Sequence, residues 1–112
     1  MPAAGGVFAS AGRIWLPVLD NTTGAVVNHL FQWGAVTNGG SGKDGSLTFG
    51  VAFPTAIGGI VFYGNDTSNG GFSVTKTTTT LSGCGAVFRD LSINYPFVAS
   101  RLLSAGYLAW GW

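Results

Sequence analysis

The chain has 112 residues, which is enough for one domain but not for a second with its own core. Charged residues make up 8% of it and hydrophobic residues 46%; this balance excludes disorder, because disordered chains are rich in charge and poor in aromatic residues. The formal net charge is +1 and no basic residues cluster along the sequence, so nucleic acid is not expected as a partner.

The composition favours strands over helices. Glutamate is absent, and Met, Gln and Lys are scarce, so most good helix formers other than Ala and Leu are missing. In their place the chain has 19 glycines, many threonines and 13% aromatic residues. Such a composition predicts an all-β chain with many turns.

The low charge also bears on assembly. A compact monomer of 11.5 kDa exposes roughly 5,800 Å² of surface, and five Lys and Arg with four Asp leave little charge to cover it. Either Ser, Thr, Asn and Gly cover most of the outside, or a large part of the surface is buried against other copies. We favour the second interpretation.

Membrane insertion, targeting and disulfide bonding are not expected. The most apolar segment, residues 49–64, is short and is interrupted by Pro54 and several glycines. Residues 1–12 lack the basic start and the long apolar run of a signal peptide. Cys84 is the single cysteine and is expected to be a small buried apolar residue.

The first half of the chain contains three strand candidates separated by turn signals. Residues 13–19 form a short strand that Pro17 places at a sheet edge, and a dense turn signal at 20–24 leads into a long strand over 25–37. The glycine-rich segment 38–45 is expected to be an exposed loop. From Ser46 to Phe53 the alternation is the cleanest in the chain, and it predicts a shared core face of Leu47, Phe49, Val51 and Phe53.

The second half continues the pattern. Residues 60–63 are a continuous apolar run that predicts a buried strand, and 65–71 are an exposed turn. Strands are expected over 72–80, 83–88 and 107–112, whereas 89–104 reads as a long loop with a helical turn at 101–103. About six to eight short strands with regular turn signals predict a small antiparallel β-sandwich.

Catalytic and metal chemistry find little support. The four Asp residues each lie in a turn signal, where an Asp side chain caps backbone groups, and they do not form a glycosidase pair. His29 is the only histidine, lies inside a predicted strand and is expected to be a packed or interface residue. No catalytic residues, no metal site and no cofactor are therefore expected.

Binding chemistry remains. Sugars are held by planar hydrogen-bonding side chains around an aromatic face, and Arg89, Asp90, Asn94 and Tyr95 offer this mixture within seven residues. An ordinary polar loop is the alternative interpretation. Other loops carry further candidates, and the sequence does not decide which loops share an end of the sandwich: Asn38, Lys43, Asn65 and Asp66.

Four motifs, with the Thr-rich strand between the third and the last, occur in an order that resembles the C-terminal tip domain of gp53-like phage tail-fibre proteins. They are Arg13-Ile14-Trp15-Leu16-Pro17, Phe31-Gln32-Trp33-Gly34, Thr48-Phe49-Gly50-Val51-Ala52-Phe53-Pro54 and the terminal Tyr107-Leu108-Ala109-Trp110-Gly111-Trp112. Together the matching segments span residues 13–112, nearly the whole chain.

The resemblance implies a β-sandwich akin to H-type lectin domains that assembles as a homotrimer at the tip of a fibre on the virion or tailocin. Residues 1–12 are then a flexible lead-in from the fibre shaft, and 13–112 form the receptor-binding domain. The implied partners are other copies, the shaft, a host surface glycan such as lipopolysaccharide and, as a further candidate, an assembly chaperone. Two alternatives to a non-enzymatic receptor-binding protein stay open: a structural trimerisation cap and a polysaccharide depolymerase.

Overall fold

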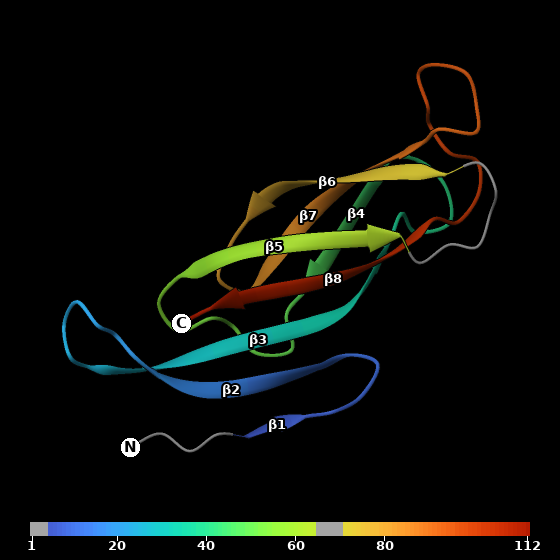
Figure 1. The fold of residues 1–112 in the computed structure, drawn as a ribbon. Coiled ribbons are helices and arrows are strands. Elements are labelled where there is room, and N and C mark those ends of the chain that lie inside the picture. The colour runs from blue at the N-terminus through green and yellow to red at the C-terminus, as the bar shows by residue number, and fades with distance from the viewer. Residues whose placement is uncertain (1–4, 65–70) are drawn as a thin grey trace.

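The computed structural model describes residues 5–64 and 71–112, which form eight strands and no helix (Figure 1). In chain order the strands are β1 (Gly5–Val7), β2 (Gly12–Leu19), β3 (Val26–Thr37), β4 (Asp44–Thr48), β5 (Ile57–Gly64), β6 (Phe72–Thr79), β7 (Gly83–Asp90) and β8 (Ser104–Gly111). None of the described segments is a helix long and apolar enough to cross a membrane.

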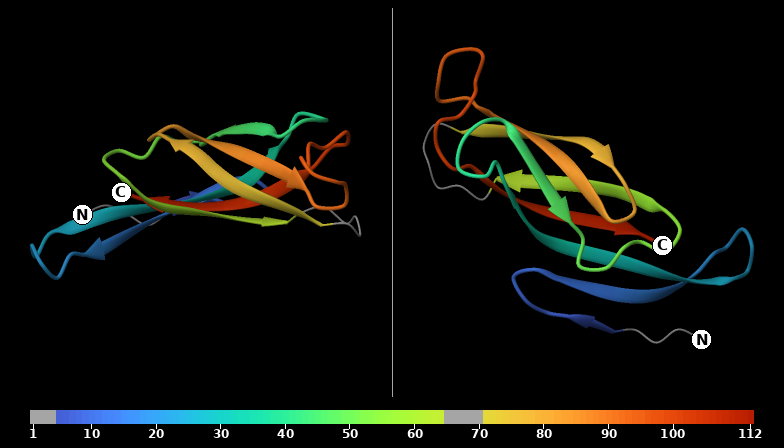
Figure 2. Two further views of the ribbon diagram at one scale, coloured as in Figure 1. Left: turned by 90° about the horizontal axis from the view of Figure 1, so that it is seen from above. Right: turned by 180° about the vertical axis from the view of Figure 1, so that it is seen from behind.

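The strands make two sheets that pack face to face (Figure 2). The larger sheet has the order β1-β2-β3-β8-β5 and the smaller one β4-β7-β6, and all neighbouring strands are antiparallel. The predicted antiparallel β-sandwich is confirmed. Pro17 lies beyond the described pairing of β2 with β1, so no described strand on that side requires its missing N–H.

The core lies between the two sheets and comes from alternate residues of both. The larger sheet contributes Leu30, Val36, Ala105, Tyr107 and Ala109, and the smaller sheet contributes Leu47, Cys84, Ala86 and Phe88. Loop residues Phe49, Phe53, Ala99 and Leu103 close it. The prediction that Cys84 is a small buried apolar residue is confirmed, since 4% of it is exposed.

The predicted strand over residues 46–53 is only half right. β4 ends at Thr48, and the chain then becomes irregular, with the Phe49 and Phe53 amides donating to the carbonyls of Ser82 and Leu81. Phe49 and Phe53 are nevertheless buried as predicted, whereas Val51 is half-buried. The burial of alternate residues, Phe49 and Phe53, therefore continues after the regular strand ends at Thr48.

The prediction of a buried strand at residues 60–63 is wrong. β5 is the last strand of the larger sheet, so Ile60 and Phe62 pack against the core while Val61 and Tyr63 are about half exposed, at 48% and 54%. The continuous apolar run thus reflects an apolar sheet face on the outside of the sandwich, not burial on both sides.

Two further expectations about local structure need correction. Residues 101–103 form no helical turn; they are an irregular approach to β8. Within the segment interpreted as a lead-in, Gly5–Val7 form β1, which pairs with Arg13–Trp15 of β2. The role of residues 1–12 as a connection to a shaft stays a prediction.

The molecule is elongated, with extents of 53 × 25 × 19 Å and a radius of gyration of 16.3 Å, against about 13 Å for a compact chain of this length. One cause is the hairpin of β2 and β3. The tip of this hairpin projects beyond Leu30, the last β3 residue that pairs with β8 (Figure 1). No described strand of the smaller sheet pairs with it. Apolar side chains at this tip, such as Val18, Leu19 and Val26, are exposed.

Candidate functional site

The topology gathers most of the candidate residues at one end of the sandwich, which we call the loop end. β3, β5 and β7 finish there, and β4, β6 and β8 begin there, as the pairs Thr37–Ser104, Gly64–Ala105 and Phe72–Asp90 show. The segments 38–43 and 91–103 therefore lie at the same end (Figure 1). β1 enters from the other direction, because Gly5 is opposite Trp15 and the strand runs toward the loop end.

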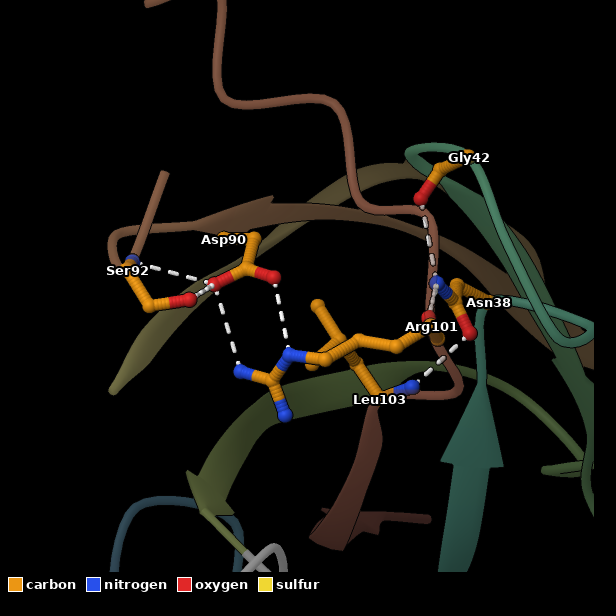
Figure 3. Close-up of polar contacts among 6 residues, drawn as sticks. All are labelled: Asn38, Gly42, Asp90, Ser92, Arg101 and Leu103. Atoms are coloured by element: carbon orange, nitrogen blue, oxygen red, sulfur yellow. Dashed lines mark hydrogen bonds and ion pairs between the residues drawn. The ribbon is translucent and has the colours of Figure 1, made fainter. Parts of the chain in front are cut away.

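Asp90, the last residue of β7, organises the segment 91–103 (Figure 3). Its side chain is 1% exposed and accepts hydrogen bonds from Arg101 Nε at 2.9 Å and Nη2 at 3.2 Å, in a two-point ion pair. Ser92 adds its backbone N–H at 3.0 Å and its hydroxyl at 2.5 Å. The two ends of the segment are thereby fastened to one carboxylate.

These contacts set the charge state of Asp90. Hydrogen bonds from Arg101, then from the Ser92 hydroxyl and backbone N–H, hold the pKa of the Asp90 carboxyl well below its usual range, against the opposing effect of burial. The carboxylate is ionised at neutral pH and fully engaged by its neighbours. It has no free oxygen to offer a ligand, so its place in the structure is that of an anchor.

Asn38 anchors the segment 38–43 as Asp90 anchors the segment 91–103. Because Asn38 is buried, the expectation that the glycine-rich segment is exposed throughout is wrong at this residue. Its side chain is 4% exposed; Nδ2 donates to the carbonyls of Gly42 at 3.1 Å and Arg101 at 3.0 Å. Its Oδ1 accepts from the backbone N–H of Leu103 at 2.9 Å (Figure 3). It also accepts from the backbone N–H of Gly40 at 3.3 Å. Both donors and both acceptor positions of the amide are used, so Asn38 also joins two segments instead of facing a ligand.

The other candidates point to solvent. Arg89, Asn94 and Tyr95 are exposed, and 83% of Tyr95 is accessible. Lys43 is exposed as well and pairs with its neighbour Asp44 at 3.1 Å. Asn65 and Asp66 lie outside the described residues.

The backbone around Tyr95 has an unusual conformation. Phe97 has a φ of 64°, in the left-handed region that bulky residues rarely adopt. Its N–H donates to the Asn94 carbonyl at 3.1 Å, its carbonyl accepts from the Asp90 N–H at 2.9 Å, and its ring meets the Tyr95 ring edge-on at 5.7 Å. The presentation of Tyr95 is thus tied to the Asp90 anchor.

Sequence reasoning missed several residues at this end. Arg101 and Ser92 complete the Asp90 anchor, but nothing in the sequence pairs residues eleven apart in an irregular segment. A shallow hollow of about 400 Å³ beside the segment 38–43 is lined by Thr37, Gly39, Asp44, Gly45 and Ser46. The segment 91–103 also exposes four apolar side chains: Leu91, Ile93, Val98 and Leu102. Apolar residues in a predicted loop were the sequence feature that could have identified them.

The loop end carries side chains of the kinds that contact sugars. Hydroxyl groups of Thr37 and Ser46, the carboxylate of Asp44 and the ring of Tyr95 are groups that pair with sugar hydroxyls or stack on sugar rings. The described residues contain no group of three or more His, Cys, Asp or Glu side chains placed to hold a metal ion.

Comparisons with known proteins agree with this architecture. The profile of a family described as "Putative tail fiber protein gp53-like, C-terminal" matches residues 29–112. The fold is similar to that of an N-truncated R2-type pyocin tail fiber, with a TM-score of 0.67 and 20% identity over 99% of this chain and 38% of that chain. An N-truncated R1-type pyocin tail fiber gives a TM-score of 0.64 and 22% identity over 99% and 87%.

A longer R2 pyocin fiber of P. aeruginosa gives a TM-score of 0.68 and 21% identity, over 99% of this chain but only 26% of that one. The chain thus spans well under half the length of both R2-type fibres. A search of curated protein sequences finds no match.

Proposed function

Since the chain belongs to the gp53-like tail fiber C-terminal family, we propose that it is the receptor-binding tip of a phage or tailocin tail fibre, and that its loop end contacts polysaccharide on the host surface. The domain is then part of the virion or tailocin and acts outside the host cell. The proposed assembly is a homotrimer, joined to a shaft upstream, with a host glycan such as lipopolysaccharide as the receptor.

One observation carries the proposal: the polar side chains of the loop end divide into anchors and presented groups. Asn38 and Asp90 are buried and hold the segments 38–43 and 91–103 in one conformation. Tyr95 and Arg89 stand outside that framework and are free to meet a partner. A surface whose shape is fixed before binding loses less conformational entropy when it binds.

The position of this surface supports the same function. β1 enters from the opposite direction, so the loop end faces away from the side on which a shaft would continue. Each copy in a trimer would present one loop end in that direction. Weak contacts to a repeating polysaccharide are then multiplied by avidity.

We propose that the domain binds without cleaving. The Asp90 carboxylate is held in its ion pair with Arg101, and the exposed Asp44 carboxylate is paired with Lys43. A depolymerase needs two carboxyl groups flanking one bond, one of them with a raised pKa. Asp90, whose carboxylate is paired and whose pKa is lowered, does not have that environment.

The experiment is a binding assay on host cells and on purified lipopolysaccharide, with a parallel assay for newly released reducing sugar. We expect binding without sugar release for the native chain, and Tyr95→Ala to weaken binding by about tenfold or more. Asn21→Ala, an exposed change at the far hairpin turn, is the matched control and should bind as the native chain does.

The outcomes separate the alternatives. Release of reducing sugar would replace the proposal with a depolymerase. A folded trimer that binds neither cells nor lipopolysaccharide would leave a structural cap. Equal loss of binding in Tyr95→Ala and Asn21→Ala would move the receptor surface away from the loop end.

A further inference from the structure

The larger sheet has a second face, turned away from the core, which we call the outer face. The register places these side chains on it: Ile14, Leu16 and Val18 of β2, Val27, His29, Phe31 and Trp33 of β3, Leu108 and Trp110 of β8, Val61 and Tyr63 of β5, and Trp112 beyond β8. No outward position of these strands carries a charged residue. No strand of the described chain covers this face.

The outer face is also flattened. Tyr63 lies across Gly106, where a Cβ atom would approach its ring to 2.0 Å, and Trp110 lies across Gly59, where a Cβ would approach to 2.5 Å. Glycine at these two positions lets both rings lie against the sheet instead of standing off it. The result is a broad apolar wall.

Its size is that of an interface. The four longer strands, β2, β3, β8 and β5, lie about 4.8 Å apart and are about eight residues or more in length, which gives a face on the order of 500 Å² in projection, before the relief of the side chains is added. Stable protein interfaces cover about 800 Å² per partner, and monomers rarely expose continuous apolar patches beyond a few hundred Å². The isolated chain exposes 6416 Å², above the roughly 5,800 Å² of a compact monomer of its mass.

Two occupants of the outer face can be compared: a glycan and a second copy of the chain. A glycan is a poor match for this face. Leu16, Val18, Val61 and Leu108 are exposed aliphatic side chains that offer sugar hydroxyls no hydrogen bond, and a polar group buried without one is costly. A second copy supplies an equally apolar, uncharged and flat face.

We propose that the outer face is the surface through which copies of this chain associate, with Val61, Tyr63 and Leu108 in the contact. This inference depends on the proposed function for one point only: the number of copies is taken as three because the proposed fibre tip is a homotrimer. Association around a closed symmetry axis also explains how so apolar a face avoids open-ended aggregation.

The test introduces charge at the wall. Val61→Asp and Leu108→Asp are compared with Thr75→Asp, which puts the same charge on an exposed outward position of β6 in the other sheet. Light scattering should give about three times 11.5 kDa for the native chain and for Thr75→Asp, and 11.5 kDa for both outer-face variants. Circular dichroism identifies any variant that fails to fold, and Val61→Lys, on the edge strand, then takes its place.

Tryptophan emission gives an independent reading. Trp33, Trp110 and Trp112 lie on the outer face, whereas Trp15 is on the opposite one. Diluting the native chain should shift its emission to longer wavelengths as the copies separate. The outer-face variants should show the shifted spectrum at every concentration.

A native chain that is monomeric at 100 µM, or folded outer-face variants that keep the native mass, would overturn the proposal. Its failure is distinguishable from failure of the proposed function. Monomeric variants that still bind a soluble oligosaccharide of the receptor would support both. A native multimer that binds no receptor would overturn the proposed function alone.

Discussion

The space between the sheets and the loop end both contain buried side chains, but different chemistry predominates in each. Between the sheets, aromatic and aliphatic side chains such as Phe49, Phe53 and Phe88 pack without polar partners. At the loop end, the buried groups are Asn38 and Asp90, each with several hydrogen bonds. Apolar packing is non-directional, whereas a buried amide or carboxylate accepts few geometries.

The difference separates two tasks. The core stabilises the sandwich and depends on volume and hydrophobicity. The buried Asn38 and Asp90 fix the path of the segments 38–43 and 91–103. The exposed residues of those segments can then be substituted without changing that path. A receptor-binding domain needs both properties, and here they reside in different residues.

The largest effect is expected in the core. Phe49→Ala should lower the free energy of unfolding by about 3–5 kcal/mol, because it leaves a cavity beside Phe53 and Tyr107, whose rings lie 5.0 and 6.0 Å away. Chemical denaturation measures it. Val51→Ala, at a half-buried position of the same segment, should cost less than half as much, and equal costs would mean that this segment packs differently.

A smaller loss is expected at the Asn38 anchor. Asn38→Ala should cost about 1–3 kcal/mol, because it leaves the carbonyls of Gly42 and Arg101 and the N–H of Leu103 without their partner. Asn38→Asp keeps the shape but turns a carboxylate toward two carbonyls, so it should not restore stability. A stable Asn38→Asp variant would show that the donated hydrogen bonds contribute nothing.

The sequence predicts the apolar core of the sandwich better than it predicts the buried polar residues of the loop end. Alternation of apolar residues locates β3, β4 and β8 and the burial of Phe49 and Phe53, because it depends on neighbours along one strand. The buried Asn38 could not be predicted from a glycine-rich segment, because its partners Arg101 and Leu103 are 63 and 65 residues away. The sequence predicts Asp90 as a turn residue or a ligand contact and not as a buried partner of Arg101, because the orientation of a side chain at a strand end does not follow from its neighbours along the chain.

The Asp90 anchor should make stability depend on acid pH. A carboxyl whose pKa is lowered on folding contributes stability above its unfolded pKa, near 3.8, and loses that contribution as the pH falls further. The melting temperatures of the native chain and of Asp90→Asn should therefore differ at pH 7, and the difference should shrink progressively as the pH falls below about 4. Asp20, whose pKa is also lowered by the Thr22 N–H, is retained in both chains and cancels in the comparison. A difference that persists unchanged to pH 2 would exclude the ion pair as its source.

The smallest effect on stability is expected one residue before the anchor. Arg89 and Asp90 are neighbours on β7 and point to opposite sides of the sheet, so Arg89 is exposed where Asp90 is buried. Arg89→Ala should leave the melting temperature within about a degree of the native value, because exposed positions without special contacts change stability little. Asp90→Ala should clearly lower the melting temperature, because the guanidinium of Arg101 loses this carboxylate and Ser92 loses its acceptor.

If Arg89 meets the receptor, Arg89→Ala should bind host cells less well at unchanged stability, whereas weaker binding by Asp90→Ala should accompany its loss of structure. Thermal melts and cell binding on both single variants measure the two effects separately, and a large fall in melting temperature for Arg89→Ala would contradict the division of this strand end into an anchor and a presented group.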